Sequence, residues 1–208
     1  MKKNEWVYRE ILYRFMEKGE RFFTQKSLSE RCGVSIGNVN KSISPLEKMN
    51  AIEKKPRGFS VINWRKILLY WASTRNLEKD IIYRTRTGMD AGGIERSLPR
   101  AIFTAYSGYK FMFRTAPADY SEVIVYGDAA EIRERFPEMK GIPDLIVLKT
   151  DSHLRKFRKA PLAQIYVDLW NLGTWYAEDF IKGMDKRMDS RMKAVSPPSK
   201  KALPAKRW

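Results

Sequence analysis

The chain has 208 residues, of which 43% are hydrophobic and 12% aromatic, and this composition is ample for packed cores in two modest domains. Its 40 Lys and Arg against 24 Asp and Glu give a formal charge of +16, which favours a polyanionic partner such as nucleic acid or an acidic membrane surface. No run of about twenty apolar residues and no apolar signal core occurs, so we exclude a membrane-spanning class and expect a cytoplasmic protein.

The first predicted elements are two helices and a turn. Residues 5–18 place apolar side chains at helical spacing, and Gly19 ends the pattern. Thr24 can cap a second helix that runs through Cys32, and Gly33 supplies the turn that follows. This order predicts the first half of a helix-turn-helix.

A third helix follows, which Ser35 can cap. Its core face is expected to carry Ile36, Val39, Ile43 and Leu46. Its other face carries small or hydrogen-bonding side chains suited to a major groove: Gly37, Asn38, Asn40, Lys41 and Ser42. Asn38 or Asn40 could bind adenine in a bidentate manner. Pro45 should kink or end this helix near Ser44.

Two short β runs, 51–55 and 59–62, predict a hairpin joined by Pro56, Arg57 and Gly58. Its basic tip can hold the sugar-phosphate backbone. Residues 1–63 therefore predict a winged helix-turn-helix domain that binds double-stranded DNA. The candidate DNA-binding residues are Lys26, Ser35, Gly37, Asn38, Asn40, Lys41, Ser42, Lys54, Lys55 and Arg57.

Residues 64–79 predict a linking helix that Asn63 can cap. Its apolar stripe consists of Trp64, Ile67, Leu68 and Trp71. Such a stripe favours packing between domains, and a homodimer helix just outside the wing is the alternative.

From Asp80 onward short β runs alternate with helices, which predicts a separate α/β domain over residues 80–193. Its expected strands are 80–85, 122–126 and 144–149, and its expected helices are 97–113, 129–136, one from Pro161 to a break near Gly173, and 174–188. Residues 194–208 form a basic, Pro- and Lys-rich tail that we expect to be disordered. The predicted fold class is α+β: an N-terminal winged helix-turn-helix followed by a smaller-sheet α/β domain that ends in C-terminal helices.

Residues for catalysis are sparse. One cysteine, Cys32, and one histidine, His153, rule out the usual His/Cys zinc sets, and Cys32 is better explained as a small buried hydrophobe. Pro143 and Asp144 faintly resemble the start of a nuclease site, but the later acidic-x-Lys strand is missing, so Asp144 is expected to orient the start of a strand. Asp128 is expected to cap a helix. We predict no catalytic residue, no metal and no cofactor.

One segment resembles a known family. Residues 161–169 hold Pro161, Gln164, Tyr166 and Asp168 in a P-x-x-Q-x-Y-x-D-L pattern, which resembles a helix of the AbiEi-like antitoxins of type IV toxin-antitoxin systems. The domain order is similar, as are the segments 104–108, 123–126 and 145–147. The resemblance implies a repressor that binds inverted repeats in its own promoter and whose C-terminal domain counteracts a nucleotidyltransferase toxin without necessarily binding it.

The same motif also has an interpretation that needs no partner. Gln164 and Asp168 are four residues apart, so they share one helical face and can form an intramolecular polar cluster that braces a neighbouring strand or loop.

Residues and resemblance together favour a non-enzymatic, sequence-specific transcriptional regulator, an autorepressing antitoxin whose partners are promoter DNA and a toxin encoded nearby. The alternative is a protein-interaction module that engages a toxin through the α/β domain, near Trp170, Trp175 and Tyr176. A metal-dependent nuclease centred on Asp144 is a further alternative.

Overall fold

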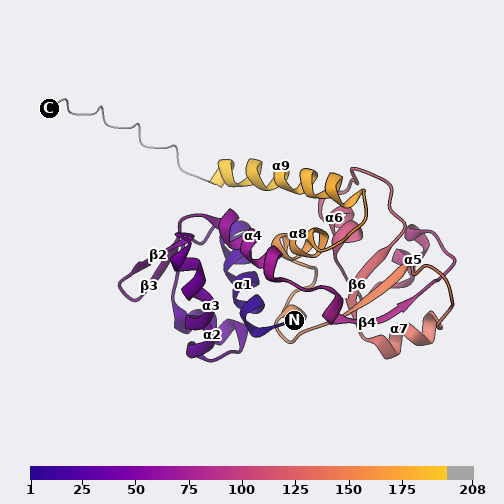
Figure 1. Cartoon of the computed structure of the whole chain (residues 1–208), viewed down its shortest axis with the longest axis horizontal. Helices are drawn as coiled ribbons and strands as arrows, with labels where there is room; N and C mark the ends of the chain where they lie inside the picture. The colour runs from indigo at the N-terminus through magenta and orange to yellow at the C-terminus, as the bar shows by residue number, and fades with distance from the viewer. Residues whose placement is uncertain (196–208) are drawn as a thin grey trace.

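The structure is a computed structural model that describes residues 1–195, so the predicted tail at 194–208 lies almost wholly outside the described residues. It is a mixed α+β fold with two small sheets and helices at both ends. Figure 1 shows the N-terminal elements at one end, the larger sheet at the other, and a long C-terminal helix lying above the middle of the molecule. None of the helices in residues 1–195 combines the length and the apolar composition that a membrane span requires.

The N-terminal elements follow the predicted order. They are α1 (Lys3–Lys18), β1 (Phe22–Phe23), α2 (Gln25–Cys32), α3 (Ile36–Lys48), β2 (Ile52–Lys55) and β3 (Gly58–Val61). The three strands form an antiparallel sheet in the order β1-β3-β2. Thr24 accepts a hydrogen bond from the Ser27 amide at 3.1 Å, Ser35 accepts one from the Asn38 amide at 3.2 Å, and Gly33 has a φ of 65°. The predicted caps and turn are therefore confirmed.

Two details of α3 differ from expectation. Of the two outcomes predicted for Pro45, a kink or an end of the helix near Ser44, the second was wrong: the helix continues through Pro45 to Lys48, because proline removes only one backbone donor and the turns on either side are held by tertiary packing. Ile36 is 53% exposed and does not belong to the core face. Ile36 is the first residue of the helix, and the buried face begins one turn later with Val39 and Ile43.

Helix α4 (Trp64–Thr74) begins after Asn63, whose side chain accepts a hydrogen bond from the Lys66 amide at 3.1 Å. It packs against α1 and α8 (Leu162–Trp170). Ile67, Leu68 and Trp71 are fully buried there. The apolar stripe is therefore core packing within the chain.

The larger sheet has the order β4-β7-β6-β5. Its β6 and β7 strands are parallel, and the other neighbours are antiparallel. The elements after α4 are η1 (Glu78–Asp80), β4 (Ile81–Thr85), α5 (Ala91–Ser97), β5 (Ile102–Phe103), α6 (Ala105–Phe113), β6 (Val123–Gly127), α7 (Ala129–Arg135), β7 (Leu145–Lys149), η2 (Leu154–Lys156), α8 and α9 (Ala177–Val195).

The helix expected over 97–113 was wrong in its first half. Ser97 ends α5, and Ile102 and Phe103 form an edge strand that pairs with β6. Pro99 cannot donate a backbone hydrogen bond and disfavours a helical conformation at the residue before it, so the apolar pair at 102–103 is free to join the sheet. The last helix was also misplaced, since α9 starts at Ala177 and not at Thr174.

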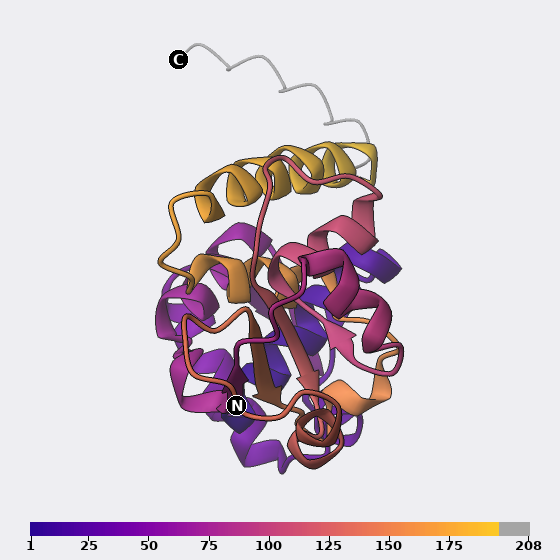
Figure 2. The same ribbon diagram turned by 90° about the vertical axis from the view of Figure 1, so that its right-hand side faces the viewer.

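The core is shared between the two halves of the chain. One continuous cluster runs from α1, α3 and α4 through α8 to α6 and α9. A smaller cluster lies between the other face of the larger sheet and helices α5 and α7. Figure 2 shows α9 lying across the top of the molecule above the strands. Helices α1 and α8 are in contact, so α8 joins the half of the chain that holds the larger sheet to the N-terminal elements.

Candidate nucleic-acid interface

The outward face of α3, with its N-cap, carries half of the ten DNA-binding residues predicted from the sequence. Ser35, Gly37, Asn40 and Lys41 are exposed, and Asn38 is half-buried. The exposed Ile36 stands at the start of the same surface. This end of α3 therefore offers amide, hydroxyl, ammonium and apolar groups to a groove.

Ser42 does not belong to that surface. It is only 2% exposed, and its hydroxyl donates a hydrogen bond to the Asn38 carbonyl oxygen at 2.7 Å. A serine hydroxyl four residues after a helical carbonyl commonly bonds back in this way. The expectation that Ser42 contacts DNA is corrected on this ground.

The tip of the β2–β3 hairpin holds three exposed basic side chains, two of which already have partners. Lys54 pairs with Glu47 at 2.7 Å, and Lys55 pairs with Glu53 at 2.7 Å. Arg57 has no ion pair or hydrogen bond with any residue in 1–195. Its φ of 68° lies in the left-handed region, which is uncommon for a residue other than glycine.

The hairpin is fixed to β1 by Gly58. A Cβ atom at this position would lie 2.3 Å from the Phe23 carbonyl oxygen and 2.6 Å from the Phe22 ring. Only glycine permits that approach. The tip is therefore held in place by the backbone of a neighbouring strand.

A groove of about 350 Å³ separates the hairpin from the start of α2. Lys26, Lys54, Lys55 and Arg57 line it together with Thr24 and Ile43. Four of the predicted DNA-binding residues, from two elements, are thus brought to one concave surface. Such a concentration of positive charge raises the local concentration of anions.

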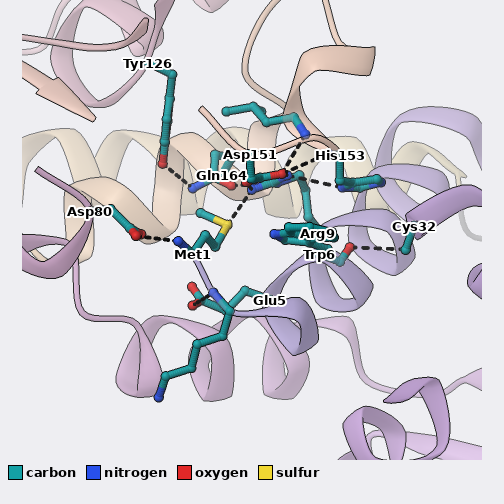
Figure 3. A network of polar contacts seen from close by, with 12 residues as sticks. Met1, Glu5, Trp6, Arg9, Cys32, Asp80, Tyr126, Asp151, His153 and Gln164 are labelled. Carbon is teal, nitrogen blue, oxygen red and sulfur yellow. Dashed lines mark hydrogen bonds and ion pairs between the residues drawn. The ribbon is translucent and has the colours of Figure 1, made fainter. Parts of the chain in front are cut away.

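A second set of polar residues is fully buried and joins α1 to α8 and to the segment after β7. Arg9 donates two hydrogen bonds to the Asp151 carboxylate, at 3.0 and 2.7 Å, and one to Gln164 Oε1 at 2.8 Å. His153 Nδ1 lies 3.2 Å from Arg9 (Figure 3), and its Nε2 lies 3.0 Å from Glu10. Every member has a partner inside the chain.

The protonation of this cluster follows from burial and from Arg9. Burial alone would raise the pKa of Asp151, but the hydrogen bonds and the charge of Arg9 outweigh it, and the pKa of this carboxyl is lowered. Burial lowers the pKa of His153, against the opposing effect of Glu10. The imidazole is therefore biased toward its neutral form.

The cluster continues around Asp168. This carboxylate is fully buried and accepts hydrogen bonds from Thr104 at 2.7 Å, Tyr126 at 2.6 Å, Gln164 at 3.0 Å and Arg75 at 3.3 Å. The predicted intramolecular cluster of Gln164 and Asp168 is confirmed.

The other two motif residues lie outside that cluster. Tyr166 stacks on Trp170 with ring centroids 6.0 Å apart, and burial raises its pKa to about 12. Pro161 precedes the first turn of α8. The four residues of the P-x-x-Q-x-Y-x-D-L motif therefore support α8 in different ways: Gln164 and Asp168 through the polar cluster, Tyr166 through Trp170, and Pro161 at the start of the helix.

Arg9, Arg75 and His153 were missed as members of this cluster. Arg9 stands two residues from Val7 and from Ile11, so helical periodicity places it on the far side of α1 from the core. It is buried because α8 and residues 151–153 cover that second side. No local pattern carries this signal.

The residues weighed for catalysis have structural partners. Asp144 was expected to orient the start of a strand; its carboxylate instead accepts hydrogen bonds from the amides of Thr87 at 2.7 Å and Gly88 at 3.2 Å, so it holds the loop that follows β4. Asp128 caps α7 through the Ala130 amide at 2.8 Å. Cys32 is buried, and its thiol donates to the Trp6 carbonyl oxygen. Residues 1–195 contain no group of three or more His, Cys, Asp or Glu placed to bind a metal ion.

Comparisons of the chain with protein-family models, with curated proteins and with solved structures give no match.

Proposed function

We propose that residues 1–63 are a winged helix-turn-helix that binds double-stranded DNA, with α3 as the recognition helix and the β2–β3 hairpin as the wing. The observation that carries the proposal is the position of Arg57, an unpaired guanidinium on a hairpin tip that faces the start of α2 across a basic groove. A buried or paired cation is explained by its contacts within the chain. The guanidinium of Arg57 has no such contact in residues 1–195, so it is available to bind phosphate.

Asn40 and Ile36 are the side chains we propose for reading bases. Asn40 is exposed and can donate to and accept from an adenine edge. Ile36, exposed at the first turn of α3, can contact a thymine methyl group. Base edges in the major groove offer both kinds of contact.

Arg57 and Lys26 are the groups we propose for the phosphate backbone. Each lines the groove between α2 and the wing. Lys54 and Lys55 lie at the same place, but each would have to leave a carboxylate partner before binding phosphate. Arg57 therefore contributes more than either lysine.

We further propose that the protein is an autorepressing transcriptional regulator and antitoxin, as the resemblance of residues 161–169 implies. Gln164 and Asp168 support α8 from inside the fold, so they hold the larger sheet against α1 and leave toxin recognition to other residues. Two exposed tryptophans favour the alternative role as a protein-interaction module. Trp170 is the last residue of α8, and Trp175, which is 81% exposed, precedes α9.

The test is binding of the full chain to a duplex from its own upstream region and to a scrambled duplex of equal length, each over a range of salt concentrations. A regulator binds the first more tightly at every salt concentration. Equal affinity for both duplexes, with a steep salt dependence, would leave only a basic DNA-coating protein.

The alternative role is tested by co-purification. The full chain should co-purify with the product of a neighbouring gene, and Trp175→Ala should abolish that co-purification.

A further inference from the structure

The segment after β7 carries a second concentration of positive charge. Residues 155–159 include Arg155, Lys156, Arg158 and Lys159, all exposed, and no acidic residue. The side chain of Arg155 has no ion pair or hydrogen bond with any residue in 1–195. The segment belongs to the larger-sheet half of the chain, far in sequence from α2 and α3.

The buried polar cluster holds this segment against the N-terminal elements. Asp151 accepts hydrogen bonds from the amides of His153 at 3.0 Å and Leu154 at 2.8 Å, which fixes the 3-10 turn η2, and from Arg9 of α1. The Phe157 ring meets Tyr13 of α1 edge-on, with centroids 4.9 Å apart. The basic side chains are therefore carried on a rigid support.

Lys156 marks where the segment meets the helix-turn-helix. Its ammonium donates a hydrogen bond to the carbonyl oxygen of Arg31, in the last turn of α2. Arg31 itself is 58% exposed and lies 3.8 Å from Glu10. The turn at Gly33 and the exposed start of α3 follow directly along the chain.

The wing and the 155–159 segment thus adjoin opposite ends of α2. Lys26, in the first turn of α2, shares a groove with the wing, whereas Lys156 contacts the last turn. The eight residues of α2 span about 12 Å. That length is close to the width of the major groove, about 12 Å, across which the two sugar-phosphate strands face each other.

We propose that Arg31, Arg155 and Lys156 form a second phosphate-binding site, which contacts the duplex strand on the side of α3 away from the wing. The larger-sheet half then contributes directly to DNA affinity and fixes how the recognition helix enters the groove. This inference rests on the proposed function, and its ligand is the backbone of double-stranded DNA.

The test compares the wild type with the double variant Arg155→Gln, Lys156→Gln on a labelled mixed-sequence duplex of about 30 base pairs, by fluorescence anisotropy over a range of salt. The salt slope is the fall in the logarithm of the DNA-binding constant per unit logarithm of salt concentration, and two lost phosphate contacts lower it by about 1.8. The ratio of the wild-type to the variant binding constant should therefore shrink about tenfold between 50 and 200 mM salt. Arg158→Gln is the matched control, because Arg158 lines a different hollow, beside Phe111 and Met112.

Lys156→Arg keeps the charge and should keep the salt slope, which separates loss of charge from loss of the bond to Arg31. A single variant, Arg155→Gln, should lower the slope by about 0.9 without changing the midpoint of thermal unfolding. An unchanged salt slope in the double variant, or an equal fall in slope in Arg158→Gln, would overturn the second phosphate site. If Arg57→Ala still weakens binding in that case, the proposed function stands without the site. If neither the wild type nor any variant binds duplex, the proposed function fails with it.

Discussion

The molecule handles charge in two opposite ways. In the buried cluster around Arg9 and Asp168, every charged group has hydrogen-bonding partners from other elements of the chain. On the exposed wing and on the exposed 155–159 segment, the side chains of Arg57 and Arg155 have no ion-pair or hydrogen-bond partner in residues 1–195. Both regions contain Arg in a strongly basic chain, so abundance of charge does not distinguish them.

The comparison separates structural charges from binding charges. A buried ion is costly to desolvate and is retained only with partners, so its removal destabilises the fold. An exposed, unpaired cation contributes little to folding and remains available to an anion. Variants in the two regions should therefore change different quantities, the free energy of unfolding in one case and the affinity for DNA in the other.

The largest effect is expected from Asp168→Ala. This variant leaves Arg75 buried beside Glu5 and Asp80 without its partner in α8, and the free energy of unfolding should fall by about 3–5 kcal/mol. Chemical denaturation followed by circular dichroism measures it. Asp168→Asn keeps an acceptor oxygen and should lose less.

The matched control is Asp189→Ala, which breaks an exposed pair between Arg65 and α9. The expected cost is about 0–1 kcal/mol, since Asp189 is half exposed and Arg65 retains Asp185. Equal losses in the two variants would contradict the distinction between buried and exposed charge.

Asn40→Ala should leave folding unchanged and reduce sequence preference. Loss of a bidentate contact to adenine would lower discrimination between the upstream duplex and its scrambled counterpart by about 1–3 kcal/mol. Competition binding with both duplexes measures the difference. Ser42→Ala is the control, because Ser42 is buried and its hydroxyl bonds only to Asn38. A drop in preference for the control alone would show that bases are read from another face.

Arg57→Ala should weaken binding to every duplex alike and lower the salt slope by about 0.9, the contribution of one phosphate contact. Salt titration of the affinity measures it. The left-handed φ of Arg57 calls for a second variant, Arg57→Asn, since Asn adopts this conformation more readily than Ala. Both variants should bind equally weakly if the charge matters, and only Arg57→Ala should weaken binding if the turn conformation matters.

The smallest effect concerns pH. Burial lowers the pKa of His153 in the folded protein, so its contribution to stability is complete above the ordinary pKa of about 6.5 and is lost as pH falls toward the folded value. Burial raises the pKa of Glu17, which acts in the opposite direction. Denaturation of the wild type and of His153→Gln at pH 7 and pH 5 separates the two, because only the wild type loses the His153 contribution.

Predictions that depended on neighbouring residues succeeded. Thr24, Ser35 and Asn63 cap the helices that follow them, and Asp128 caps α7, as expected. Each of these contacts joins residues two or three positions apart, so the residue types and their spacing nearly determine them.

Predictions that depended on which faces become covered were less successful. Ile36 was assigned to the core and is exposed, whereas Ser42 was assigned to the DNA surface and is buried. Ile102 and Phe103 fit a helical pattern equally well, but β6 offered an open edge. Short apolar stretches fit more than one periodicity, and the partner element decides between them.

By itself, the sequence determined the capped starts of α2, α3, α4 and α7, the turn at Gly33, the basic hairpin and the shared face of Gln164 and Asp168, because each depends on residues within a few positions of one another. Only the tertiary structure decided that Arg9 is buried against Gln164, 155 residues away, and that Lys156 lies on α2, 125 residues from Arg31. Side-chain burial on the second face of a helix depends on which distant elements dock there, and local periodicity does not encode that choice.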